Sequence, residues 1–385
     1  MTPAARIQAA IEILDRVLDG EAAEKALTGW ARRSRFAGSK DRAAIRDHVF
    51  DAIRCKRSFA ARGGAMTGRG LMIGLARAQE LDTDALFSGE GHAPAPLSEA
   101  EAAAGHAPEG AEALDIPDWL EQTFRDSLGD QAEAVAAVLQ SRAPVMLRVN
   151  RRKADIAQAQ TSLSGEGIET RPAEISDTAL LVTEGARKVS NSAAFKSGLV
   201  ELQDGASQAV VDALPLADGM RVLDYCAGGG GKTLAMAGRA QGRFFAHDAN
   251  AGRLVDLPAR AKRAGVKVQL LEPGKVEGQF DLVLCDVPCS GSGSWRRAPD
   301  GKWRLSAENL SELNGIQQSI LEEACGFVAP GGVLAYATCS VLSCENGAQV
   351  DGFLSRHAEW RETLRKQWLP GPEGDGFFLS VLTHG

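Results

Sequence analysis

The sequence has no run of apolar residues long enough to cross a membrane. No segment of its 385 residues approaches the roughly 18 to 20 consecutive apolar residues that a spanning helix needs. The first ten residues, MTPAARIQAA, also lack the apolar block of a secretory signal peptide. We therefore expect a protein without a membrane partner, located in the cytoplasm, in which 44% hydrophobic residues suffice for ordinary cores.

Metal-binding patterns are also missing. The seven cysteines are an odd number without the dense spacing of a secreted disulfide framework, and no pair has the two-residue gap of a structural zinc site. No histidine pairs with a carboxylate at a recognisable catalytic spacing. We therefore expect no metal site, and in a reducing compartment the cysteines stay as thiols that are open to catalysis.

Positive charge is scarce overall but concentrated in one segment. The net charge is −7, yet residues 32–62 hold ten lysines and arginines against three acids, whereas residues 80–121 hold eleven acids and no lysine or arginine. The basic segment suits a solvated helix face or an RNA contact surface, and the sequence does not choose between them. The acidic segment is poor in large apolar residues and predicts a mobile linker.

The periodicity of apolar residues divides the chain into a helical part and an α/β part. Apolar residues recur at helical spacing over residues 5–18 and 42–53. From Met220 onward strands and helices alternate, which predicts a doubly wound parallel sheet. We therefore predict an α/β protein with four parts: a helical domain (1–78), the linker (79–113), a small α/β subdomain (114–200) and a Rossmann-like domain (201–385).

A glycine-rich loop, DYCAGGGGKT, follows the first predicted strand of this sheet at residues 224–233. Four consecutive glycines let the backbone approach a ligand closely, and the next helix presents free amides, so the loop predicts a nucleotide-like ligand. A phosphate-binding P-loop is a competing interpretation, but it requires a glycine at the position of Cys226. Asp248, after the second strand, is placed to hold ribose hydroxyls, or else to cap a helix.

Two cysteines stand where apolar runs give way to small and polar residues. Cys289 lies in DVPCSGSG (286–293), and Cys339 lies in YATCS (336–340). Such positions fall at the carboxyl edge of an α/β sheet, where ligands bind. Two thiols at one edge indicate covalent chemistry.

Taken together, these motifs resemble the RsmB (Sun, Fmu) group of S-adenosylmethionine-dependent RNA 5-methylcytosine methyltransferases. The likeness covers nearly the whole chain: residues 38–54 resemble a NusB-type helical RNA-binding module, and RRAPDGKW (296–303) is similar to the branch acting on small-subunit ribosomal RNA. Further similar segments are LRVN (147–150), LQDGASQ (202–208), APGG (329–332), YATCSVLSCEN (336–346) and DGFF (375–378). The resemblance implies a monomeric methyltransferase with S-adenosylmethionine as cofactor and 16S ribosomal RNA as substrate.

The resemblance also implies roles for the two thiols. Carbon 5 of cytosine is a poor nucleophile, and thiolate attack on carbon 6 makes it reactive; a second group can then assist release by proton transfer. In this family the thiol of the TCS motif attacks, which implies Cys339 as nucleophile and Cys289 in product release. DNA cytosine methyltransferases instead use a cysteine after proline, a pattern that Pro288 and Cys289 would satisfy.

Further site residues follow from the same resemblance. Asp286 would recognise the cytosine at ring nitrogen 3 or the exocyclic amine, with a turn acid as the alternative, and Lys232 would lie near substrate and cofactor, with a solvated lysine as the alternative. Glu272 is the nearest candidate for the acid that contacts the adenine side. The residues expected to bind the cofactor are Cys226, Ala227, Gly228, Gly229, Gly230, Gly231, Lys232, Asp248, Glu272 and Asp286.

The sequence departs from the family pattern in the glycine loop. Gly228 and Gly229 replace an alanine and a proline there, which gives a looser backbone before the cofactor binds. Aromatic and cationic residues over 295–304 suit the stacking of unpaired bases, or else core packing. Transfer RNA as substrate, a catalytically weak RNA-binding assembly factor, and a small-molecule or DNA methyltransferase remain alternatives.

Overall fold

The computed structural model describes residues 1–384. It divides into two compact units. The helical unit comprises Met1–Arg125, Gly129–Arg142 and Trp295–Leu305, and the sheet unit comprises Asp126–Leu128, Ala143–Ser294 and the chain from Ser306 onward. The helical unit is therefore discontinuous, because it includes a segment that follows Cys289 in the sequence.

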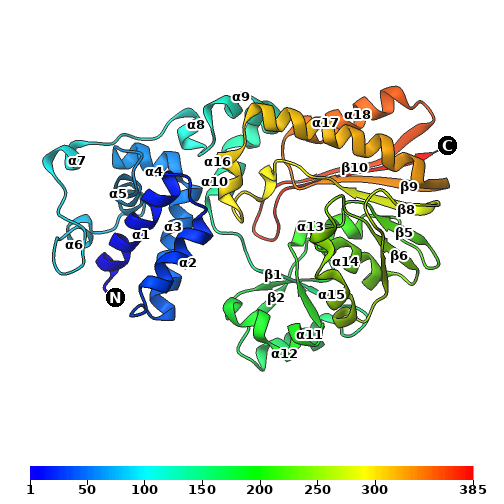
Figure 1. The fold of residues 1–385 in the computed structure, drawn as a ribbon, viewed down its shortest axis with the longest axis horizontal. Coiled ribbons are helices and arrows are strands. Elements are labelled where there is room, and N and C mark those ends of the chain that lie inside the picture. Colours follow the sequence, from blue (N-terminus) through cyan, green and yellow to red (C-terminus); the bar gives the residue numbers. More distant parts are fainter. Residues whose placement is uncertain (385) are drawn as a thin grey trace. The chain divides into compact units, whose positions relative to one another are not determined.

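The helical unit is built on a bundle of five amino-terminal helices, coloured blue in Figure 1. In α1 the side chains of Ile7, Leu14 and their neighbours at helical spacing are buried in one core, and Thr2 caps the helix by accepting from the amide of Ala5. Gly63 lets α4 and α5 approach, since a Cβ there would lie 1.8 Å from the carbonyl oxygen of Gly70. The helices are α1 (Pro3–Leu18), α2 (Ala23–Arg33), α3 (Ser39–Arg54), α4 (Lys56–Gly63), α5 (Gly68–Ala78), α10 (Ala132–Gln140) and α16 (Pro299–Arg304), with α9 (Glu121–Leu128) at the boundary.

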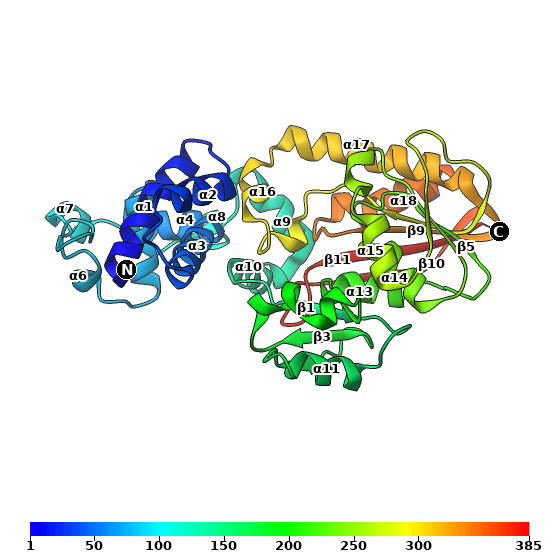
Figure 2. The ribbon, with the colours of Figure 1, turned by 60° about the horizontal axis from the view of Figure 1, so that its bottom comes forward.

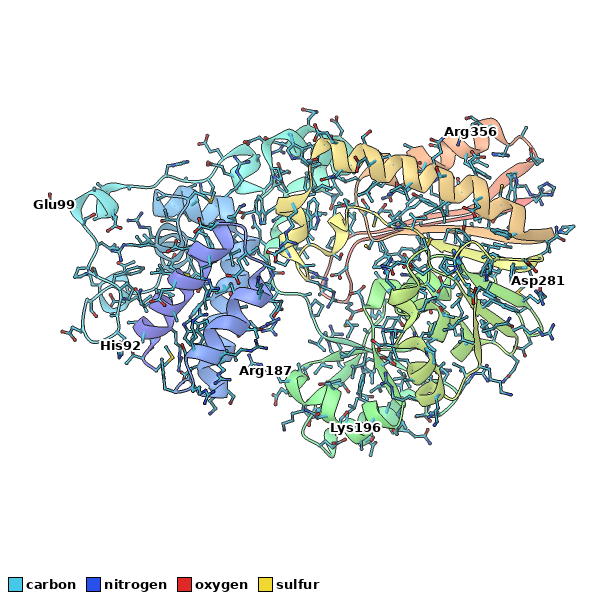
Figure 3. All side chains as sticks on the ribbon, in the orientation of Figure 1. His92, Glu99, Arg187, Lys196, Asp281 and Arg356 are labelled. Atoms are coloured by element: carbon cyan, nitrogen blue, oxygen red, sulfur yellow. The ribbon has the colours of Figure 1, made fainter. Side chains whose placement is uncertain are left out.

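Residues 79–113 do not form the separate mobile linker that their composition predicts. They contain α6 (Thr83–Leu86), α7 (Glu99–Ala103) and α8 (Gly110–Ala113) and belong to the helical unit; Figure 3 labels His92 and Glu99 in this segment. Arg69 forms an ion pair with Glu101 at 2.6 Å, and Arg77 donates to the carbonyl oxygens of Ala104 and Glu101. Composition misleads here because arginines from α5, rather than apolar residues of the segment itself, hold much of it in place.

The sheet unit is centred on a seven-stranded sheet with the order β10-β11-β9-β8-β5-β6-β7. Strands β5 to β9 are parallel, as predicted, but β11 is antiparallel to both β9 and β10, so the sheet is mixed. Strand β10 lies at the edge of the sheet, where most of its side chains are exposed. Its sequence is accordingly polar, and the sequence analysis did not predict it as a strand. The strands are β5 (Arg221–Asp224), β6 (Arg243–Ala246), β7 (Val268–Leu270), β8 (Phe280–Asp286), β9 (Val328–Thr338), β10 (Trp360–Trp368) and β11 (Phe377–His384).

Helices cover both faces of this sheet (Figures 1 and 2). One face packs against α13 (Gly205–Asp212) and α14 (Gly231–Arg239), with α15 (Leu257–Ala264) beside β6. The opposite face packs against α17 (Ala307–Ala324) and α18 (Gly347–Arg356). Arg356, labelled in Figure 3, forms an ion pair with Glu322 of α17 at 2.8 Å, which joins these two helices.

A second, four-stranded antiparallel sheet precedes the large one, with the order β2-β3-β1-β4. Its elements are β1 (Met146–Val149), α11 (Ile156–Ser164), β2 (Thr170–Pro172), β3 (Ala179–Val182), α12 (Ala193–Lys196) and β4 (Val200–Leu202). The predicted subdomain (114–200) contains nearly all of this sheet, but its first residues belong largely to the helical unit. Among residues 1–384, no helix combines the length and the apolar character needed to cross a membrane.

Candidate active site

The predicted site residues gather at the carboxyl edge of the parallel strands. The glycine loop follows β5, Asp248 follows β6, Asp286 ends β8, and Cys339 follows β9. This is where ligands bind in open α/β sheets, because the loops of neighbouring strands converge there. The register of the strands therefore brings together residues that lie far apart in the sequence.

The two thiols predicted to act together lie in contact. The Sγ atoms of Cys289 and Cys339 are 3.4 Å apart, and both side chains are half-buried. A hydrogen bond from the Cys289 thiol lowers the pKa of Cys339 and raises the pKa of Cys289. Burial and the charge of Asp286 oppose this lowering at Cys339, and the charge of Lys232 supports it, so that the pKa of Cys339 stays below its ordinary value. Cys339 is thus the sulfur that this environment favours as a thiolate.

An ion pair joins the loop after β5 to the end of β8. The Nζ atom of Lys232 lies 2.7 Å from the Oδ2 atom of Asp286, and Lys232 is only 7% exposed. Burial disfavours the ammonium, but the attraction of Asp286 outweighs burial and the pKa of Lys232 is raised. The same ammonium lies 4.6 Å from the ring centroid of Phe377. Lys232 is therefore a fixed cation beside the thiols and not a solvated surface lysine.

The glycine loop is held in place by its neighbours. The amide of Gly228 donates to Asp248 at 2.9 Å, and the amide of Ala227 donates to the carbonyl of His247 at 2.9 Å. Gly228 and Gly230 have φ of 53° and 77°, and a Cβ at Gly230 would lie 2.3 Å from the Leu257 side chain. Only glycine fits this backbone without strain, so the sequence change at Gly228 matches the loop's conformation.

The other residues predicted to bind a cofactor have different surroundings. The carboxylate of Asp248 is buried and also accepts from the amide of Asn250. Burial raises the pKa of Cys226 far above its ordinary range, so this residue stays a neutral thiol beside the loop. Glu272 lies in an exposed loop after β7, where its carboxylate pairs with Lys275 at 2.5 Å.

Two buried acids at this edge escaped the sequence analysis. Asp224 accepts from the Thr233 hydroxyl at 2.6 Å, its Oδ1 atom has no partner among the described residues, and burial raises its pKa to about 7. Glu345 accepts from the amide of Ser290 at 2.7 Å, from the Ser340 hydroxyl and from Gln317. Glu345 therefore ties the residue after Cys289 to the residue after Cys339. The sequence shows that Glu345 lies in the segment CEN, but it does not show which residues hydrogen-bond to Glu345.

The aromatic and cationic segment after Cys289 does not present Trp295 for base stacking. Trp295 is 2% exposed, and the segment belongs to the helical unit. The Arg54 carbonyl accepts from Lys302 at 2.9 Å, and the indole N–H of Trp303 donates to the carbonyl of Ile53 at 2.7 Å. Of the two interpretations that the sequence left open, core packing therefore applies to Trp295.

We also searched the described residues for side chains that could bind a metal ion. Within residues 1–384, no group of three or more histidine, cysteine, aspartate or glutamate side chains is arranged to hold an ion.

Comparisons with known proteins agree with this arrangement. Residues 211–382 match the family model described as 16S rRNA methyltransferase RsmB/F, and residues 116–189 match the model of its ferredoxin-like domain. The chain is 35% identical over 283 residues to ribosomal RNA small subunit methyltransferase B of Serratia proteamaculans. That match covers 69% of this chain and 66% of the relative, slightly less than two thirds of its length.

Solved structures share the fold. The crystal structure of PH0851 covers 99% of both chains with a TM-score of 0.75 and 24% identity. The structure of NSun6 from Pyrococcus horikoshii with SFG covers 70% of this chain and 98% of that one, with a TM-score of 0.62 and 17% identity. At these identities the likeness speaks for the fold alone.

Proposed function

This chain belongs to the RsmB/F family of methyltransferases, and from that premise we propose that it methylates carbon 5 of a cytosine in 16S ribosomal RNA. The observation that carries the proposal is the contact of two thiols, 3.4 Å apart, beside a buried ammonium at the sheet edge. A methyltransferase acting on a nucleophilic nitrogen or oxygen would need no such thiol pair, because its substrate atom attacks directly.

The residues at the glycine loop fit S-adenosylmethionine as cofactor. Gly228 and Gly230 have positive φ, and as glycines they leave the loop backbone uncovered by side chains. Asp248 holds the loop in place by accepting a hydrogen bond from the amide of Gly228. We propose that residues 226–231 and Asp248 hold the cofactor, with Glu272 retained as a weaker candidate because it is exposed. The bound cofactor would supply an electrophilic methyl group on a sulfonium.

Cys339 is the proposed nucleophile. Its pKa is lowered by the hydrogen bond from Cys289 and by Lys232, which raises the thiolate fraction available for attack on carbon 6 of the base. Asp286 would hold the ring at nitrogen 3 or at the exocyclic amine while charge develops there. The ion pair with Lys232 keeps that carboxylate oriented. The target base must leave any helix to reach these groups.

Cys289 is proposed to act after transfer. The adduct loses the carbon 5 proton and expels the Cys339 thiolate, and a proton-accepting group near the base speeds this elimination. Cys289 keeps its proton while it donates to Cys339, so it would first release that proton to solvent; its raised pKa then makes the thiolate a stronger base than an ordinary thiolate, and it takes up the carbon 5 proton as the carbon 6–sulfur bond breaks. Glu345 would keep the two cysteine loops in register during both steps.

The remaining parts of the proposal concern substrate and setting. The match to small-subunit relatives favours 16S ribosomal RNA over transfer RNA. The likeness of residues 38–54 to a NusB-type module stays a prediction, as do a cytoplasmic location and a monomeric state. The predicted domain limit at 200 likewise remains a proposal.

Three single variants test the mechanism. Cys339→Ser should abolish both methyl transfer and covalent capture of RNA, and Cys289→Ala should accumulate an RNA complex that survives denaturation, because adduct forms but is not released. Cys344→Ser is the matched control, since this half-buried thiol lies five residues from Cys339 and has no proposed role. Capture by Cys339→Ser, or normal turnover by Cys289→Ala, would show that the thiols are assigned wrongly.

Bisulfite sequencing tests the substrate. RNA from cells with and without the protein should differ at one cytosine of 16S ribosomal RNA. A difference in transfer RNA instead would favour the alternative substrate, and no difference in any RNA would favour an assembly factor without turnover.

A further inference from the structure

The turn between α2 and α3 exposes a large aromatic side chain. Phe36 is 76% exposed, whereas Trp30 and Ala37 on either side of it are buried in the core of the helical unit. Single exposed apolar side chains are common on protein surfaces, so the exposure of Phe36 points to a partner only in combination with the groups around it.

Backbone hydrogen bonds hold this turn in one conformation. The amide of Ser34 donates to the carbonyl of Trp30 at 2.9 Å, and the amide of Ala37 donates to the carbonyl of Ser34 at 3.1 Å. The guanidinium of Arg42 donates to the carbonyl of Ala37 at 2.9 Å. Phe36 is therefore presented outward from a turn that is anchored on both sides, which lowers the entropy lost when a partner binds.

Four cations surround Phe36 in the sequence: Arg32, Arg33, Arg35 and Lys40. All four are exposed, and none forms an ion pair with any described residue. The nearest acid along the chain, Asp41, is already occupied by Arg6 at 2.8 Å and by the amino terminus at 3.3 Å. The turn therefore carries an uncompensated positive charge although the chain as a whole is negative.

Other cations of the helical unit behave differently. Arg16 pairs with Glu21, Arg57 pairs with Asp118, and Arg69 pairs with Glu101. The contrast indicates that the charge at the turn is not needed to hold the fold together. A solvated helix end would account for the cations alone, but it gives no reason for the exposed aromatic ring among them.

We propose that this turn binds an unpaired segment of RNA outside the active site, with one base stacked on Phe36 and phosphates held by Arg32, Arg33, Arg35 and Lys40. Every base offers a π face to an aromatic ring, and a flexible single strand can place phosphates around it. The inference rests on the proposed function for the class of partner, and it adds a second RNA-binding surface to the sheet edge.

The test measures binding by the full chain of a fluorescein-labelled, single-stranded RNA of about 12 nucleotides, by anisotropy at several salt concentrations. Phe36→Ala should weaken binding at least about fivefold with an unchanged salt dependence, because stacking carries no charge. Phe36→Trp should restore it. Val255→Ala is the matched control, since Val255 is an apolar side chain exposed to 75% in the sheet unit.

Charge is tested separately. Replacing Arg32, Arg33, Arg35 and Lys40 by Gln should reduce the slope of log affinity against log salt by about 0.7 for each phosphate that the variant no longer neutralises. Lys25→Gln is the control, because Lys25 is an exposed lysine of the same helix α2 that lies away from the turn.

Three outcomes would overturn the inference: equal binding by Phe36→Ala and Val255→Ala, an unchanged salt slope in the four-residue variant, or displacement by polyglutamate as effective as by unlabelled RNA. The last result would indicate an acidic protein partner instead. These failures leave methyl transfer by the wild type intact. Conversely, a clear effect of Phe36→Ala on RNA binding in a protein that methylates no RNA would overturn the proposed function and leave the surface standing.

Discussion

Two lysines are buried among residues 1–384, and their surroundings differ. Lys232, 7% exposed in the sheet unit, faces the carboxylate of Asp286 at 2.7 Å, and its pKa is raised. Lys302, 2% exposed in the helical unit, donates to the carbonyl of Arg54, and burial lowers its pKa to about 8. At Lys232 the attraction of Asp286 outweighs burial, whereas at Lys302 burial outweighs the attraction of Asp115.

We infer from this difference that the charge of Lys232 serves the chemistry of the site, whereas Lys302 serves packing in the helical unit. Around Lys232 lie groups that are not tied up by the backbone: the half-buried thiol pair, and the buried Oδ1 atom of Asp224, which has no partner among the described residues. Around Lys302 the polar groups are bound to backbone, as when Asp115 accepts from the amides of Arg57 and Ser58. Changes at the first cluster should affect rate, and changes at the second should affect stability.

Lys232→Met should have the largest effect. Loss of the cation frees Asp286 and raises the pKa of Cys339, so single-turnover methyl transfer should fall about 10²- to 10³-fold. Part of the rate should return as the pH rises, because more Cys339 then ionises. Lys302→Met is the matched control at the second lysine and should leave the rate at saturating RNA close to that of the wild type. A rate loss shared equally by both variants would remove the distinction.

Asp115→Ala should destabilise the helical unit without changing the chemistry. The substitution leaves the amides of Arg57 and Ser58, at the start of α4, without their acceptor, and Gln140 loses its partner as well. We expect a loss of about 2 to 3 kcal/mol in the free energy of unfolding, measured by urea denaturation. Asp115→Asn keeps an acceptor and tolerates the φ of 52° at this position, so it should lose less. Equal stability of Asp115→Ala and the wild type would contradict the assignment.

Lys302→Met should change how stability depends on pH. The folded pKa of about 8 lies below the ordinary 10.5, so the unfolded chain binds more protons between these values, and Lys302 makes wild-type stability rise with pH across that window. Asp115, Cys55, Lys56 and Arg54 also face this ammonium. Comparing the variant with the wild type at each pH isolates Lys302.

The substitution Lys302→Met should therefore add least to the free energy of unfolding at high pH, where the wild-type lysine is neutral in the folded protein. We expect the stability difference between Lys302→Met and the wild type to shift by about 2 kcal/mol between about pH 7 and pH 10, in urea titrations with reductant. A difference that stays constant with pH would mean that the lysine keeps an ordinary pKa when folded.

The sequence predicted local features better than long-range ones. The alternation of strands and helices from Met220 onward was predicted and is observed, because short runs of apolar residues mark buried strands. The approach of Cys289 to Cys339 followed from two motifs at one sheet edge, although their chemical roles remain predictions. The fit of Glu345 between two serines was not predictable, because it depends on the packing of α17 and two loops.

The errors share one physical cause. Residues 79–113 and 295–305 are held largely by hydrogen bonds and ion pairs with distant parts of the helical unit, and composition does not register such partners. The aromatic and cationic residues of 295–305 therefore looked like a nucleic-acid surface when several of them are internal. Phe36 shows the opposite case, since exposure of a single side chain cannot be read from its neighbours in sequence.

Strand β11 has a consequence for how the protein is made. It follows β10 in the chain, yet it hydrogen-bonds to both β9 and β10 and so lies between them. During vectorial synthesis β9 keeps an unpaired edge until β11 has left the ribosome, and such edges invite association with other chains. A nascent chain that already contains both cysteines therefore still lacks the strand that covers the free edge of β9.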